Sequence, residues 1–249
     1  MHKEQIECFK KASLKNYEDS LVIHVQKIIP KVSKIAGVYN VRKLVQEGIQ
    51  KASYFGFNYQ GPVRFYIDLM LLLGCGFHND PQFPWASNIL NASDERGQMF
   101  RSKKLFVHTN NYVETVYGHN NIYLTNAIEK FCDINFVKNY HHFDDTQSLL
   151  KILNFIYPQK FEYVGVKNLL KLVEQLKSIK LLLSINHESS LLVIAGIMFA
   201  FGHKFFVDPL YPWIVKELNK DELEESQRIL KIYKKIKIYL DHALLKLKG

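Results

Sequence analysis

Apolar residues recur at helical spacing through most of this 249-residue chain. Between residues 6 and 29 they return every three, four or seven positions with charged residues between them, which predicts an amphipathic helix ended by Pro30. The same pattern predicts further helices at 38–52, 63–73 and 218–247. Strand-like alternation is scarce, so the predicted fold class is all-α, built from bundles of helices.

The chain also resembles itself at a spacing of 128 residues. Between residues 37 and 91, 16 of 55 positions carry the same residue as the position 128 further on, whereas chance gives roughly three or four. The matched residues include Gly74 with Gly202, Asp80 with Asp208, and Trp85 with Trp213. A period this long marks a domain-sized unit and not a solenoid repeat.

The duplication predicts two tandem helical-bundle units that pack together about a pseudo-twofold axis. The first unit covers 1–118, the second covers 129–249, and 119–128 connects them. Each unit is expected to hold four or five helices, so 94–117 should be the first unit's equivalent of the helix at 218–247. Because two fused copies often replace an ancestral homodimer, a monomer is expected.

Composition narrows the class of protein. With 47% hydrophobic residues the chain is not disordered. Its most apolar stretch, 191–201, is about half of the roughly twenty residues that cross a bilayer, and the first residues lack the apolar run of a signal peptide. Cys8, Cys75 and Cys132 are too scattered for a disulfide framework or a zinc cluster. These features predict a cytoplasmic protein with reduced thiols.

The net charge of +9 favours an acidic partner. The predicted helix at 218–247 is basic and amphipathic, a pattern of membrane-surface or nucleic-acid binders and also of the last helix in a bundle. Arginine is sparse, and aromatic residues do not interleave with a basic stripe, which argues against nucleic acid. An acidic face on a partner protein is therefore the expected contact.

An Asp-Pro-x-x-Pro-Trp loop occurs twice and is the most specific local motif. One hypothesis is a recognition loop in which a stiff turn presents aromatic rings and carboxylates. The favoured alternative is structural: the aspartates cap the short helix that follows, and the tryptophans lock it to the core. The candidate binding residues are those of the two loops, namely His78, Asp80, Trp85, Asp208 and Trp213.

No catalytic residue, metal site or cofactor is predicted. His78 and Asp80 alone define no mechanism, and Phe206 stands at the position matching His78. The run 141–145, His-His-Phe-Asp-Asp, is dense in potential metal ligands, but adjacent histidines usually diverge, and the aspartates suit a helix start. Phosphate-binding loops, nucleophile elbows and the zinc-binding His-Glu-x-x-His motif are absent from the sequence.

The motifs of 40–90 resemble those of a poorly characterised family of helical bacterial proteins encoded beside secreted toxins, including type VI secretion effectors. The resemblance is carried by Gly48-Ile-x-x-Ala52-x-x-x-Gly56, Tyr66-Ile-Asp-Leu-Met70, Gly74 and Phe77-x-x-Asp80-Pro-x-x-Pro-Trp-Ala86. It is only partial in the second unit, where Leu176 replaces Gly48 and Gly196 replaces Asp68. The family brings no catalytic residues.

The resemblance implies a toxin-binding protein, which is the leading of three hypotheses; the other two come from different classes of protein. The first is a non-enzymatic immunity or accessory (chaperone or adaptor) protein that covers the active surface of a secreted toxin. The second is a toxin or hydrolase whose site lies around His78 and Asp80, or around His141 and Asp145. The third is a basic binder of nucleic acid or membrane surfaces, whose binding would fall steeply with salt.

Overall fold

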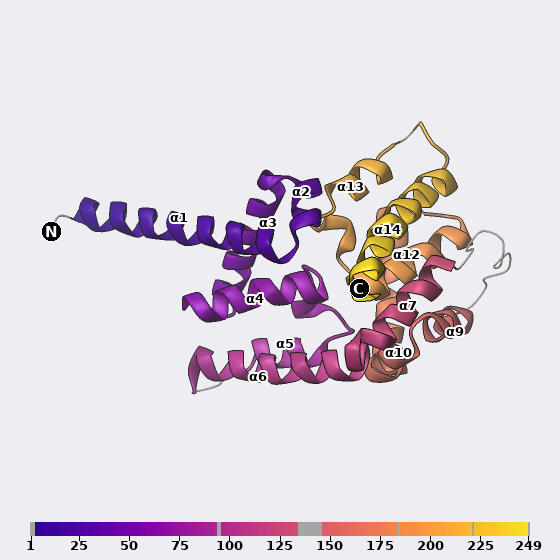
Figure 1. The fold of residues 1–249 in the computed structure, drawn as a ribbon, viewed down its shortest axis with the longest axis horizontal. Coiled ribbons are helices and arrows are strands. Elements are labelled where there is room, and N and C mark those ends of the chain that lie inside the picture. Colours follow the sequence, from indigo (N-terminus) through magenta and orange to yellow (C-terminus); the bar gives the residue numbers. More distant parts are fainter. Residues whose placement is uncertain (1–2, 94–95, 134–145, 184, 221, 249) are drawn as a thin grey trace.

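The computed structural model describes residues 3–93, 96–133, 146–183, 185–220 and 222–248, and every regular element among them is a helix (Figure 1). The prediction of an all-α fold is confirmed for these residues. None of the described helices is both long and apolar enough to cross a lipid bilayer.

The N-terminal part begins with a long helix whose first turns project away from the rest of the molecule (Figure 1). Its α-helices are α1 (Lys3–Ile28), α2 (Pro30–Ala36), α3 (Val38–Tyr54), α4 (Gln60–Leu73), α5 (Pro84–Leu90) and α6 (Gly97–Tyr112). Three short helical turns accompany them: η1 (Phe77–Asn79), the π-helical η2 (Val113–Tyr117) and η3 (His119–Asn121). Helix α3 packs between α1 and α4.

The C-terminal part is gathered around the last helix. Its elements are α7 (Ile122–Asp133), α9 (Thr146–Ile156), α10 (Pro158–Val164), α11 (Val166–Leu182), α12 (Glu188–Phe201), η4 (Phe205–Val207), α13 (Pro212–Leu218) and α14 (Glu225–Lys248). Helix α14 packs against α7, α12 and α13. The range 119–128, expected as a connector, is helical from residue 122 onward because α7 runs through it.

Proline and glycine set many of the helix boundaries. Helices α2, α5, α10 and α13 all open on a proline, whose fixed φ suits the first turn and whose missing N–H would have no partner there. Helix α4 stops at Gly74, as predicted, and α12 stops at Gly202. The helix predicted over 218–247 is wrong at its start, because α13 ends at Leu218 and α14 begins only at Glu225.

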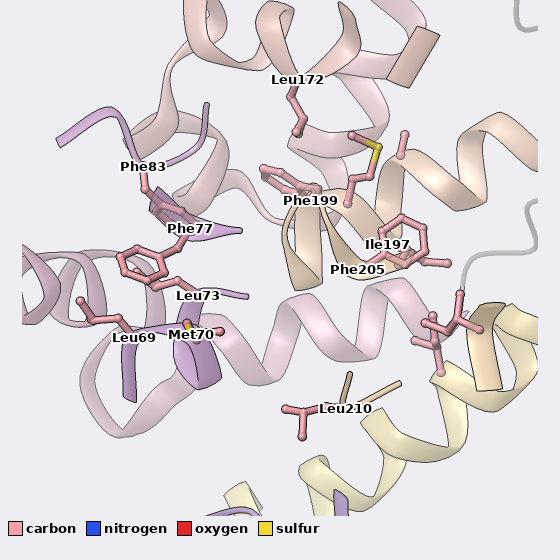
Figure 2. Packing of buried hydrophobic residues seen from close by; sticks show 14 of the residues in the cluster. Leu69, Met70, Leu73, Phe77, Phe83, Leu172, Ile197, Phe199, Phe205 and Leu210 are labelled. Atoms are coloured by element: carbon pink, nitrogen blue, oxygen red, sulfur yellow. The ribbon is translucent and has the colours of Figure 1, made fainter. Parts of the chain in front are cut away.

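One hydrophobic core spans both parts of the chain. Figure 2 shows Leu69, Met70 and Leu73 of α4 in the same cluster as Ile197 and Phe199 of α12. The predicted apolar stretch 191–201 lies in α12, most of whose side chains are buried. The two parts therefore share their apolar interior.

Candidate functional site

The two Asp-Pro-x-x-Pro-Trp loops lie where the N-terminal and C-terminal parts meet. Asp80 is buried, and both of its carboxylate oxygens accept backbone hydrogen bonds. Oδ1 accepts the N–H of Gln82 at 2.9 Å, and Oδ2 accepts the N–H of His203 at 2.8 Å. The first bond tightens the loop itself, and the second reaches across to the backbone that leads into the other loop.

Asp208 makes the reverse connection. Its Oδ1 accepts the N–H of Leu210 at 2.9 Å, and its carboxylate also accepts the backbone N–H of Cys75, which leads into the first loop. Burial raises the pKa of Asp208 to about 6, while these hydrogen bonds oppose the shift. Each carboxylate therefore stabilises its own turn and also ties down the opposite loop.

The helix-capping role predicted for these aspartates is wrong. The residues that precede α5 and α13 are Phe83 and Tyr211, and neither helix receives a side-chain cap. Each carboxylate lies four residues before its helix and accepts hydrogen bonds from the turn and from the facing chain instead. The aspartates therefore stabilise the loops through hydrogen bonds other than the predicted helix caps.

The backbones of Gly74 and Gly202 cross in direct contact between the two loops. Both residues have positive φ, +96° and +92°, which L side chains rarely adopt. A Cβ atom on Gly74 would press against the backbone carbonyl of Phe201, and a Cβ atom on Gly202 would lie 3.0 Å from the carbonyl oxygen of Leu73. Glycine is therefore required at both positions by conformation and by space.

His78 is buried beside aromatic rings and does not pair with Asp80. Its ring lies 5.8 Å from that of Phe55, and its Nδ1 has no hydrogen-bond partner among the described residues. Burial, helped by the charges of Lys204 and Lys51, lowers the pKa of His78 to about 4. The histidine near Asp80 is His203, whose Nδ1 lies 3.0 Å from Asp80 Oδ2 without hydrogen-bond geometry.

The two tryptophans are half-buried and pack against the last long helix of their own part of the chain. The Trp85 ring stacks on His108 of α6 at 5.6 Å, and the Trp213 ring stacks on Tyr239 of α14 at 5.8 Å. Both rings also border the shared core. All five candidate residues thus lie where the two loops pack against the hydrophobic core, and there they contact other parts of this chain.

A cavity beside these loops holds a residue that sequence reasoning missed. Lys160 of α10 is only 3% exposed, and its ammonium donates a hydrogen bond to the carbonyl oxygen of Phe199 near the end of α12. Burial lowers the pKa of Lys160 to about 8, and the charge of Asp80 partly offsets this. The sequence holds one sign of this residue: position 32, which lies 128 residues before Lys160, is occupied by valine, an apolar residue.

The run 141–145, considered above as a metal site, lies outside the described residues. Among the residues that the structure does describe, no three histidine, cysteine, aspartate or glutamate side chains gather as metal ligands.

Comparison of this chain with protein-family models, with curated proteins and with solved structures finds no match.

Proposed function

We propose that this chain is a non-enzymatic protein-binding module, an immunity or accessory protein for a secreted bacterial toxin, which acts by covering the active surface of that toxin. The resemblance of 40–90 to proteins encoded beside such toxins supplies the class of partner. One feature of the fold carries the protein-binding part of the proposal: the projecting arm of α1.

The arm consists of residues 7–16, ten consecutive helical residues that are all exposed to solvent. They include large apolar side chains, with Phe9 68% and Leu14 56% exposed. A free helix of this length is marginal in water, because most helical stability in proteins comes from packing against other elements. A partner that packs on the arm would supply that missing contact.

The charge of the arm favours an acidic partner. Lys10, Lys11 and Lys15 outnumber Glu7, so the segment carries three positive charges and one negative charge, a net +2. Its sign agrees with the net +9 of the whole chain. Complementary charge speeds association and suppresses wrong partners, so the bound face of the toxin is expected to be acidic around an apolar centre.

We also infer that residues 1–118 and 129–249 are copies of one helical unit. Adding 128 to the bounds of α2, α3, α4, η1 and α5 yields the bounds of α10, α11, α12, η4 and α13. Contacts repeat as well. Gln98 accepts the N–H groups of Asn58 and Tyr59 before α4, and Glu225 accepts those of Asn186 and His187 before α12.

The reciprocal contacts of the two aspartate loops are the pattern expected of a twofold interface. Asp80 binds the backbone of His203 and Asp208 binds that of Cys75, and positions 75 and 203 are themselves 128 apart. In an isologous contact, residue i meets j and residue j meets i in the same way. A rigid pseudo-dimer of this kind would hold the α1 arm in a fixed position for its partner.

Co-expression with the product of the neighbouring gene tests the proposal. The wild-type chain should capture that product and protect cells from it, and Phe9→Asp combined with Leu14→Asp should weaken capture at least tenfold. Leu181→Asp is the matched control, since Leu181 is 80% exposed at the end of α11 and lies off the arm.

Three results would count against the proposal or against the surface assigned to it. A folded wild-type chain that never associates with the neighbouring product removes the toxin-binding function. Growth inhibition by the chain alone, relieved by His78→Ala, would assign it to the toxin or hydrolase class instead. If capture survives the arm substitutions, the arm is not the contact surface.

A further inference from the structure

A cavity of about 120 Å³ lies between α7, α10 and α12, with the end of α4 closing one side. Its wall is mostly apolar and includes Phe83, Leu124, Ile128, Phe131 and Phe199. Leu72 and Ala200 are exposed at its rim, so a small molecule could enter from solvent. For comparison, an apolar protein cavity of roughly 150 Å³ is large enough to bind benzene.

Lys160 lines this cavity, and its ammonium group has no carboxylate paired with it among the described residues. Among the described residues its one hydrogen-bond acceptor is the carbonyl oxygen of Phe199, and no carboxylate lies within ion-pair distance. The rings of Phe199 and Phe83 lie 4.9 Å and 5.7 Å from Nζ, close enough for weak cation–π attraction. A buried ammonium normally has an anionic partner as well, because leaving a charge unpaired in low dielectric is costly.

Two tyrosine side chains add further donors to the cavity wall. Tyr112 and Tyr117 both line it, and within the described part of the chain neither hydroxyl has a hydrogen-bond partner. Tyr157, the third tyrosine of the wall, is different because its hydroxyl donates to the carbonyl oxygen of Val116 at 2.7 Å. Tyr117 lies in η2, and π-helical turns of this kind occur often at functional sites.

We propose that this cavity binds a small carboxylic acid with an apolar body, such as an aromatic or short aliphatic acid, with its carboxylate on Lys160 and the hydroxyls of Tyr112 and Tyr117. One positive charge matches one carboxylate, and the apolar wall matches a small aromatic or aliphatic body that reaches toward the exposed rim. A phosphate fits less well, because its second charge and larger hydration shell would find no further cation there.

The test uses phenylacetate and hexanoate with the full chain, and compares them with the uncharged amides of the same shape. At about ten times Kd, each acid should raise the melting temperature by roughly 3 °C, and calorimetry should give a one-to-one complex. The amides should bind at least tenfold more weakly. Equal binding of acid and amide would overturn the role of the ammonium, and an unchanged melting temperature with either acid would overturn the site.

Two variants test separately the charge of Lys160 and the free volume of the cavity. Lys160→Met should remove the preference for acid over amide, whereas Lys167→Met, an exposed lysine of α11, should leave it unchanged. Ala127→Leu keeps the charge but fills the cavity from α7, and it should weaken acid binding at least tenfold even if Lys160→Met folds poorly. Acid binding that survives both substitutions would place the ligand elsewhere.

The affinity should also depend on pH. Burial raises the pKa of Tyr112 and Tyr157 and raises that of Tyr117 to about 12, so Lys160 is the cavity-lining group that titrates between pH 6.5 and pH 9. With its pKa at about 8, binding of either acid should weaken about tenfold over that range. A pH-independent affinity would contradict the proposed contact.

Discussion

Lys160 shows how the free energy of one buried charge depends on pH. In the unfolded chain its pKa is that of an ordinary lysine, 10.5, whereas burial lowers it to about 8 in the folded protein. Between these values the unfolded chain holds a proton that the folded chain has released. Because the unfolded state then binds more protons, this group makes the fold more stable as pH rises.

We therefore expect the free energy of unfolding to increase by about 1.5 kcal/mol between pH 8 and pH 9.5 through Lys160 alone. The measurement is urea unfolding of the wild type and of Lys160→Met at both pH values. The variant should lack this increment, because methionine carries no proton, and other titrating groups cancel in the difference. Parallel pH profiles for the two proteins would contradict the buried ammonium.

Individual residues were the hardest feature to predict from sequence. Asp80 and Trp85 were recognised as important from their recurrence 128 positions later, but their partners come from α6 and from residue 203. Lys160 was missed because a single lysine in an amphipathic helix is normally solvated. Its ammonium is interior in the folded chain, where Phe199 of α12 and Phe83 lie against it.

At the scale of elements, apolar periodicity predicted helices well and their interruptions poorly. Helices α3 and α4 lie close to their expected ranges, because Gly56 follows the end of α3 and Gly74 ends α4. The break between α13 and α14 was missed because the residues between the two helices include neither proline nor glycine to mark it. Arg228 stabilises that break by donating to the carbonyl oxygen of Leu218 at 2.7 Å, a long-range cap that no local pattern indicates.

The arm of α1 should behave differently from the rest of its own helix. Residues 7–16 are all exposed, whereas Leu21 and Val25 of α1 are buried in the core. Amide protons of the arm should therefore exchange with solvent far faster than those of 21–28, since opening them costs almost none of the global stability. Hydrogen exchange measured by mass spectrometry checks this, and equal protection along α1 would mean that the arm is covered in solution.

At the scale of the whole molecule, the backbones of the two parts meet where Gly74 contacts Gly202. Gly37 offers a matched comparison, because it also has positive φ, +82°, but a Cβ atom there would meet nothing within 4 Å. The two positions thus separate the cost of backbone conformation from the cost of a steric clash.

We expect Gly37→Ala to destabilise the protein by about 1–3 kcal/mol, the usual cost of a strained non-glycine conformation. Gly74→Ala should cost about 2 kcal/mol more, because the added carbon also presses on the backbone at Phe201. Chemical denaturation of both variants measures the difference. Equal losses would show that the contact is loose enough to absorb a methyl group.

This close contact also has an evolutionary consequence. Where two glycines touch backbone to backbone, neither can be replaced without disturbing the other, so such positions should change rarely and together. In the duplication proposed above, positions farther from this contact have no such restriction, because each half of the chain can change without the other. Valine at 32 and lysine at 160 illustrate this freedom: under the proposed duplication, one half acquired a charge that a symmetric homodimer would have had to accommodate twice.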